Sequence, residues 1–180
     1  DAGEVARFYN RLGKHLALFF VLCGTDFHCD NLIADGEHPV FFDLEGLFHK
    51  VPSSSNEGIK DQVYKSIWSS VLFTGVLPTE EWAAGEDDND RSAVLAGEGQ
   101  TSHIELPILN VVEGIPKIER QKLTLSTPSN RPVLNKEAVD PAAYIHDLVG
   151  GFSVFYELIQ RHSELLLEQG GLLESFRGCE

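Results

Sequence analysis

Residues 25–48, TDFHCDNLIADGEHPVFFDLEGLF, decide the fold of this sequence. Over residues 25–31 polar side chains recur at alternate positions, where a buried helix would need hydrocarbon. Two short apolar runs follow at 32–33 and 40–42, and the Asp-Gly pair between them is typical of a tight turn. We therefore predict a polar loop that leads directly into a β-hairpin.

The loop and the hairpin carry five side chains that are suited to phosphoryl transfer: Asp26, His28, Asn31, Asp43 and Glu45. In the protein-kinase catalytic loop an asparagine follows the catalytic aspartate by five residues, and a metal-binding aspartate comes later. Asp26 and Asn31 have this spacing. Because Asp43 ends the hairpin, we predict that it lies beside Asn31, with their Cα atoms roughly 5 Å apart.

Phosphoryl transfer needs a carboxylate that orients the acceptor hydroxyl, and oxygen ligands for the magnesium ion at the nucleotide phosphates. We assign the first role to Asp26, with His28 either moving a proton or orienting Asp26. An amide oxygen from Asn31 and a carboxylate from Asp43 suffice for the protein's share of a magnesium site, and Glu45 adds a second carboxylate. The predicted cofactors are ATP and Mg²⁺.

Composition predicts a folded domain that does not bind nucleic acid. Hydrophobic residues make up 42% of the 180 residues, which is enough for a core. The formal net charge is -14, and no basic stripe is present to neutralise a phosphate backbone. Cys23, Cys29 and Cys179 form no CxxC pair, and no apolar run is long enough to span a bilayer. We therefore expect a cytoplasmic protein.

The remaining patterns predict an α+β fold that is mainly helical. Periodic apolar residues predict helices over 5–22, over 59–71 and from Asp140 to Gly170, and strands over 107–112 and 117–125. Ser54 and Glu57 have the spacing of a capping box before the second helix. Residues 79–102 are acidic and rich in glycine, which predicts a mobile surface loop.

Residues 24–48 resemble the dehydratase domain of class II lanthipeptide synthetases, which has a lipid-kinase-like fold. That family carries a D-x-H-x-E-N stretch and then a P-V-x-x-D-x-E-T-L-F stretch, and residues 26–31 and 39–48 match these patterns. Asp30 replaces the usual glutamate and keeps its charge. Gly46 replaces a threonine, which could loosen the segment after the metal ligand.

The resemblance implies a kinase-like C-terminal lobe with a catalytic loop and a metal-binding β-hairpin. By this resemblance Asp26 and His28 belong to the catalytic loop, whereas Asn31, Asp43 and Glu45 belong to the magnesium and nucleotide site. It also implies an enzyme that uses ATP to phosphorylate serine and threonine in a precursor peptide, which consists of a leader and a Ser/Thr/Cys-rich core. Elimination of the phosphate then leaves dehydroamino acids, to which a separate zinc cyclase domain adds cysteine thiols.

We expect residues 1–180 to be part of a longer dehydratase domain. The sequence contains no methionine, even at position 1. The resemblance places a nucleotide-binding lobe upstream of Asp1 and the elimination residues beyond Glu180. Because phosphoryl transfer depends on groups from both lobes, we expect these residues alone to be inactive.

Three other functions stay open on the sequence alone. The first is a different kinase-like phosphotransferase. The second is a metallohydrolase in which Asp26, His28 and Asp30 hold a transition metal, which would require further histidines around the same site. The third is a non-catalytic kinase-like module that binds a peptide or another partner.

Overall fold

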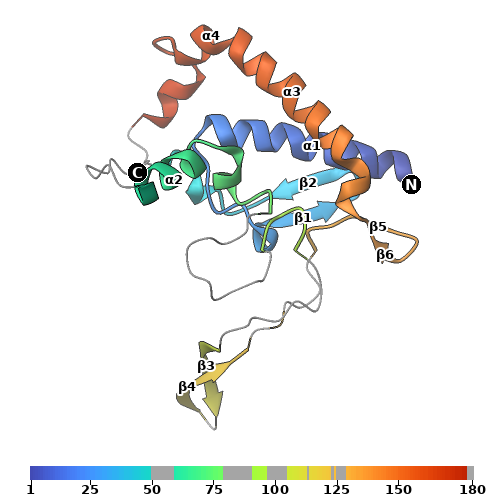
Figure 1. Cartoon of the computed structure of the whole chain (residues 1–180), viewed down its shortest axis with the longest axis vertical. Helices are drawn as coiled ribbons and strands as arrows, with labels where there is room; N and C mark the ends of the chain where they lie inside the picture. Colours follow the sequence, from blue (N-terminus) through green and yellow to red (C-terminus); the bar gives the residue numbers. More distant parts are fainter. Residues whose placement is uncertain are drawn as a thin grey trace.

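Helix α1 (Ala2–Val21) lies at the centre of the fold, between helix α3 (Ile145–Arg161) and the hairpin of β1 (Leu32–Asp35) and β2 (His38–Phe41) (Figure 1). The computed structural model describes residues 1–49, 59–78, 91–96, 105–112, 114–122, 124 and 129–177. Within these residues it combines helices with three two-stranded sheets. The kinase-like arrangement stays a prediction.

The predicted apolar stripe of α1 forms the centre of the core. Its expected inward residues, Val5, Phe8, Leu12, Leu16 and Phe19, are all at most 4% exposed. The helix begins where the Asp1 carboxylate accepts a hydrogen bond from the Glu4 N–H at 2.8 Å, which satisfies one of the free donors of the first turn. The predicted first helix is therefore confirmed, and its buried face fixes the positions of α3 and of the hairpin.

Two glycines allow α1 and α3 to touch backbone to backbone. A Cβ atom on Gly13 would lie 1.9 Å from the carbonyl oxygen of Leu148, and one on Gly151 would lie 1.8 Å from that of Asn10. Any side chain at either position would therefore overlap the backbone of the other helix. The contact also brings the Asn10 amide within 3.3 Å of the Asp147 carbonyl oxygen, to which it donates a hydrogen bond.

We expect Gly151→Ala to lower the free energy of unfolding by about 3 kcal/mol or more, because the added methyl group meets backbone that cannot rotate away. The neighbouring Gly150 is the matched control, since a Cβ atom there has no atom within 4 Å. Gly150→Ala should raise stability by about 0.5–1 kcal/mol, as expected for glycine in a helix interior. Urea denaturation measures both changes, and equal effects of the two substitutions would contradict the close helix contact.

The predicted hairpin is confirmed, with one correction to its register. Leu32 pairs with Phe41 and Asp35 pairs with His38, so Gly36 and Glu37 form a two-residue turn. Gly36 has a φ of 58°, a conformation that glycine adopts without strain. The Phe42 N–H donates to the Asn31 carbonyl oxygen at 3.2 Å. Phe42 therefore lies opposite Asn31, and the predicted partner Asp43 comes one residue later.

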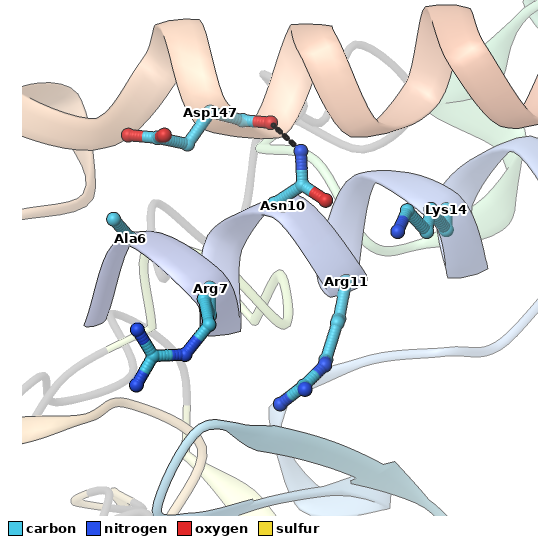
Figure 2. Close-up of a pocket in the computed structure, with 6 residues that line it drawn as sticks. All are labelled: Ala6, Arg7, Asn10, Arg11, Lys14 and Asp147. Carbon is cyan, nitrogen blue, oxygen red and sulfur yellow. Dashed lines mark hydrogen bonds between the residues drawn. The ribbon is translucent and has the colours of Figure 1, made fainter. Parts of the chain in front are cut away.

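Two arginines of α1 hold the turn of this hairpin. The Arg11 guanidinium lies 2.7 Å from the Glu37 carboxylate and also donates to the Glu37 carbonyl oxygen at 2.7 Å. Arg7 hydrogen-bonds the other carboxylate oxygen of Glu37. Both arginines line a pocket of about 320 Å³ with Ala6, Asn10, Lys14 and Asp147 (Figure 2). None of the five predicted site residues lines this pocket. We therefore interpret the contacts of Arg7 and Arg11 with Glu37 as a structural clamp on the hairpin turn.

Acid should release this clamp. Hydrogen bonds from Arg7 and then from Arg11 hold the pKa of Glu37 below its ordinary value of 4.5. A carboxylate with a lowered pKa stabilises the folded state at higher pH, and this contribution disappears as the pH falls through the folded-state pKa, below 4.5.

We therefore expect Glu37→Gln to be less stable than wild type at neutral pH, with the difference vanishing in acid. Denaturant unfolding across a pH series measures this difference. Glu137→Gln, at an exposed carboxylate on β6 (Glu137–Ala138), is the control. A difference for Glu37→Gln that is independent of pH would show that the charge of Glu37 has no part in the clamp.

The other predicted elements form with altered ends. Helix α2 (Ile59–Trp68) stops before its predicted end, and Val71–Thr74 forms a 3-10 turn that Gly75 closes. The proposed cap at Ser54 and Glu57 lies outside the described residues. The long C-terminal helix is divided at His162 into α3 and α4 (Ser163–Leu167). The remaining short elements are β5 (Val133–Leu134), β6, and 3-10 turns at Pro141–Tyr144 and Leu172–Phe176.

The two predicted strands form a separate hairpin of β3 (Leu106–Val112) and β4 (Ile115–Gln121). They pair antiparallel, with Leu109 opposite Ile118. This hairpin lies at the opposite end of the molecule from α3 and α4 (Figure 1). No helix in the described ranges is both long enough and apolar enough to cross a membrane.

The predicted mobile loop over 79–102 was wrong at residues 91–96. Ala93 and Ala96 are fully buried, and Val94 is 9% exposed. The Ala93 and Val94 N–H groups donate to the carbonyl oxygens of Gly75 and Val76 at 3.2 and 3.1 Å. The segment is buried because three small or apolar residues, Ser92, Ala93 and Val94, follow one another directly after the acidic run. The rest of the predicted loop lies outside the described residues.

Candidate functional site

The predicted catalytic loop alternates buried and exposed side chains. Phe27 and Cys29 are at most 2% exposed, whereas the Asp26 and Asp30 side chains are 70% and 53% exposed. His28 lies between these extremes. The alternation therefore fixes the loop through its apolar residues and leaves its carboxylates at the surface, where a substrate can reach them.

Phe27 anchors the loop to the core. Its ring stacks on Phe19 with a centroid distance of 3.7 Å, and the edge of Phe41 packs against it at 5.7 Å. The Phe27 N–H donates to the Thr74 carbonyl oxygen at 2.9 Å, and the Cys29 N–H donates to that of Arg91 at 2.9 Å. Segments from the helix, the hairpin, the turn before Gly75 and residues 91–96 thus hold the loop together.

Asp26 combines a strained backbone with an exposed carboxylate. Its φ is +66°, a region in which residues other than glycine are uncommon, and such strain is concentrated at functional sites. The Asn31 side-chain amide donates to the Asp26 carbonyl oxygen at 2.9 Å. Two of the five predicted site residues are therefore in direct contact, and Asn31 helps to keep the Asp26 backbone in this conformation.

His28 is placed to orient Asp26. Its Nε2 atom lies 3.5 Å from Asp26 Oδ1, and its Nδ1 atom accepts a hydrogen bond from the Asp30 N–H at 3.2 Å. Since Nδ1 is an acceptor, the neutral ring carries its hydrogen on Nε2, which faces Asp26. Of the two roles predicted for His28, the geometry favours the orienting one.

The three predicted magnesium ligands, Asn31, Asp43 and Glu45, each carry a side-chain oxygen. Asn31 is 8% exposed, and its amide oxygen has no partner among the described residues. Asp43 has a φ of 57° and its side chain does not cap the turn that follows, although its position would allow a cap. Asp43 and Glu45 are both exposed, and within the described ranges neither carboxylate has a hydrogen bond or ion pair. Amide and carboxylate oxygens are the ligand types that magnesium prefers, and the magnesium site itself stays a prediction.

Backbone contacts connect the two halves of the site. The Thr25 N–H donates to the Gly46 carbonyl oxygen at 3.0 Å, and these residues are the chain neighbours of Asp26 and Glu45. A Cβ atom on Gly46 would lie 2.1 Å from the Thr25 carbonyl oxygen. The suggestion that Gly46 loosens this segment was therefore wrong, because the glycine permits a close contact with the catalytic loop.

The metallohydrolase alternative gains little from the geometry. Among the described residues His28, Cys29 and Asp30 have donor atoms within 4.8 Å of one another, a group that lacks both Asp26 and a second histidine. Burial raises the pKa of the Cys29 thiol, which disfavours the thiolate that a metal would need. Asp30 already pairs with the Arg91 guanidinium at 2.8 Å, so a metal cation would have to displace or face that charge.

The sequence did not identify Thr74 or Arg91 as parts of the site. Both contact the loop through backbone carbonyl oxygens, and any residue type can supply such an oxygen. Arg91 also follows an acidic, polar run that predicts solvated surface. Only the burial of the next residues, Ser92 to Val94, distinguishes this segment, and the apolar Ala93-Val94 pair was too short to predict it.

The chain belongs to the family described as a domain of unknown function, DUF4135, whose sequence profile matches residues 1–180. It is also 29% identical over 174 residues to the Lacticin 481/lactococcin biosynthesis protein LcnDR2 of Lactococcus lactis subsp. lactis. The match covers 91% of this chain and 18% of that protein. The chain thus spans less than a fifth of the length of this relative.

Proposed function

We propose that the protein takes part in lanthipeptide biosynthesis as an ATP- and magnesium-dependent dehydratase. In this proposal serine and threonine side chains of a precursor peptide are first phosphorylated, and elimination of the phosphate then leaves dehydroamino acids. Membership of the DUF4135 family and the similarity to a lacticin 481 biosynthesis protein support the biosynthetic setting. The chemistry is supported by the arrangement of Asp26, Asn31 and Asp43.

One observation carries the proposal. Asp26 is exposed and strained, the Asn31 amide donates to its carbonyl oxygen at 2.9 Å, and His28 Nε2 lies 3.5 Å from one of its carboxylate oxygens. The second oxygen of Asp26, Oδ2, has no partner among the described residues. A structural aspartate at a turn would normally use its oxygens to cap nearby N–H groups, so this arrangement favours a chemical role.

Asp26 would orient the peptide hydroxyl and take its proton on Oδ2. The hydroxyl oxygen then bonds to the γ-phosphorus of ATP while the bond to the bridging oxygen breaks, and ADP leaves. His28 would keep Oδ1 in place through its Nε2–H. We assign no described residue to the later elimination step.

Asn31, Asp43 and Glu45 would hold magnesium. When bound, the ion neutralises negative charge on the nucleotide phosphates. The contribution of the chain would be to present one amide oxygen and two carboxylates that have no hydrogen bond or ion pair among the described residues. The hydrogen bond from the Thr25 N–H to the Gly46 carbonyl oxygen supports this assignment, because it joins the segment that follows Asp43 to the loop that contains Asp26.

Mass spectrometry of candidate precursor peptides tests this function. Incubation of the full-length protein with ATP, magnesium and a leader-bearing, Ser/Thr/Cys-rich peptide should give products that have lost the mass of water. A phosphorylated species should precede them, and omission of ATP should prevent both. Dehydration without ATP, or binding of the peptide without any modification, would refute the proposal.

A further inference from the structure

We propose that Arg91 is a positioning residue: its guanidinium neutralises Asp30 and thereby keeps the ring hydrogen of His28 on Nε2, where it faces Asp26. This inference rests on the function proposed above and assigns a role to a residue outside the predicted motif. It connects the catalytic loop to a segment that lies 61 residues further along the chain.

The imidazole of His28 lies between two carboxylates. Its Nε2 atom is 3.5 Å from Asp26 Oδ1, and its Nδ1 atom is 3.6 Å from Asp30 Oδ2. A neutral imidazole has one hydrogen to donate, and each of these carboxylates attracts it. The ring can therefore support Asp26 only if Asp30 does not draw the hydrogen to Nδ1.

Arg91 reduces the attraction of Asp30. Its NH2 group donates to Asp30 Oδ2 at 2.8 Å, and this is the same oxygen that faces His28 Nδ1. The other oxygen, Oδ1, lies 3.9 Å from the Cys29 thiol, which donates to it. The Asp30 N–H meanwhile occupies the lone pair of Nδ1 at 3.2 Å. These contacts together leave Nε2 as the site of the ring hydrogen.

The backbone of Arg91 is fixed independently of its side chain. Its carbonyl oxygen accepts from the Cys29 N–H at 2.9 Å, and the next residue, Ser92, forms an antiparallel bridge with His28. The buried residues Ala93 and Val94 continue this segment into the core. The Arg91 side chain is 56% exposed, and an exposed ion pair contributes little to stability. Substitution at Arg91 should therefore leave the fold intact.

Loss of the positive charge should disturb Asp26 through His28. In Arg91→Gln the unpaired Asp30 carboxylate would compete with the Asp30 N–H for Nδ1, which would increase the share of rings that carry the hydrogen on Nδ1 and turn a lone pair on Nε2 toward Asp26. We expect kcat for phosphorylation to fall by about 10- to 100-fold, with little change in the KM for ATP, because the base loses its orientation. Arg91→Lys keeps the charge and should restore most of the rate.

Nitrogen NMR of the imidazole rings tests the proposal without any activity. At alkaline pH, where imidazoles are neutral, ¹⁵N shifts distinguish a ring protonated on Nδ1 from one protonated on Nε2. The His28 signals are identified by their loss in His28→Gln. Wild type and Arg91→Lys should show the Nε2–H form, and Arg91→Gln should shift toward Nδ1–H. An unchanged ring in Arg91→Gln would overturn the proposal.

A double substitution separates positioning from a structural effect. If Arg91 acts only through the charge of Asp30, Arg91→Gln should no longer alter the tautomer or kcat once Asp30→Asn is present. Arg120→Gln, at an exposed arginine of β4, should behave as wild type, and thermal melting checks the fold of each variant.

If wild type phosphorylates and Arg91→Gln keeps its kcat, this proposal fails while the function stands. If no variant phosphorylates but the tautomer changes as expected, the function fails while the positioning stands.

Discussion

Asp26→Asn should abolish phosphorylation of the precursor peptide by the full-length protein. The substitution removes the carboxylate that takes the hydroxyl proton, and positioned bases of this kind contribute about 10²- to 10⁴-fold to the rate. Asparagine tolerates a positive φ, so the strained backbone at 66° should survive the change. Because the first of the two steps is blocked, neither phosphorylated nor dehydrated peptide should accumulate.

Mass spectrometry of the peptide over time distinguishes the two steps. A build-up of phosphorylated but undehydrated peptide with Asp26→Asn would assign Asp26 to elimination instead. Asp35→Asn, an exposed aspartate on β1 outside the site, is the matched control and should leave the rate unchanged. Thermal melting confirms that each variant is folded.

Asp43→Ala should reduce phosphorylation by at least about 100-fold, because in the proposed site it removes a charged ligand of the magnesium ion that would stabilise the transferring phosphate. Alanine is also strained at the φ of 57° that Asp43 adopts. Asp43→Gly is therefore the necessary companion, since glycine removes the carboxylate without that strain. Equal losses in the two variants would assign the effect to the ligand and not to the backbone.

Asp43→Asn tests the metal more finely. It keeps an oxygen but loses the charge, so we expect residual activity that needs more magnesium and improves with manganese. A non-catalytic binding module would show no such dependence. A metallohydrolase would depend on Asp26 and His28 and would ignore ATP. Wild-type rates in folded Asp43→Ala at limiting magnesium would remove Asp43 from the metal site.

The sequence predicted those parts of the site whose causes are local. The spacing of Asp26 and Asn31 placed both residues in one loop, and in the structure the Asn31 amide donates to the Asp26 carbonyl oxygen at 2.9 Å. The Asp-Gly turn predicted the hairpin correctly, but not its register. Paired residues extend to Asp35 and His38, which shortens the turn and moves Phe42 opposite Asn31. A two-residue turn and a longer one leave the same apolar pattern, so the sequence could not choose between them.

The parts that could not be predicted depend on distant contacts. The role of Gly46 follows from the approach of Thr25, and the burial of residues 91–96 follows from pairing with Gly75 and Val76. Neither contact leaves a periodic pattern in its own segment. The predicted helix from Asp140 is divided at His162. The apolar pattern of the sequence continues through this residue, although the helical conformation of the backbone is interrupted there. Magnesium, ATP and the kinase-like lobe stay predictions that the experiments above address.

The distance in sequence between the catalytic loop and its supports sets the order in which the site can form during synthesis. The loop depends on Thr74 and on Arg91, and Arg91 lies 61 residues after Asp30. At about 5–20 residues per second, the ribosome delivers this support roughly 3 to 12 seconds after the loop itself. Until then the Cys29 N–H group lacks its native partner, and the Phe27 N–H group lacks its own until Thr74 is made. A nascent chain therefore contains the residues of the loop before it contains the residues that fix the conformation of the loop.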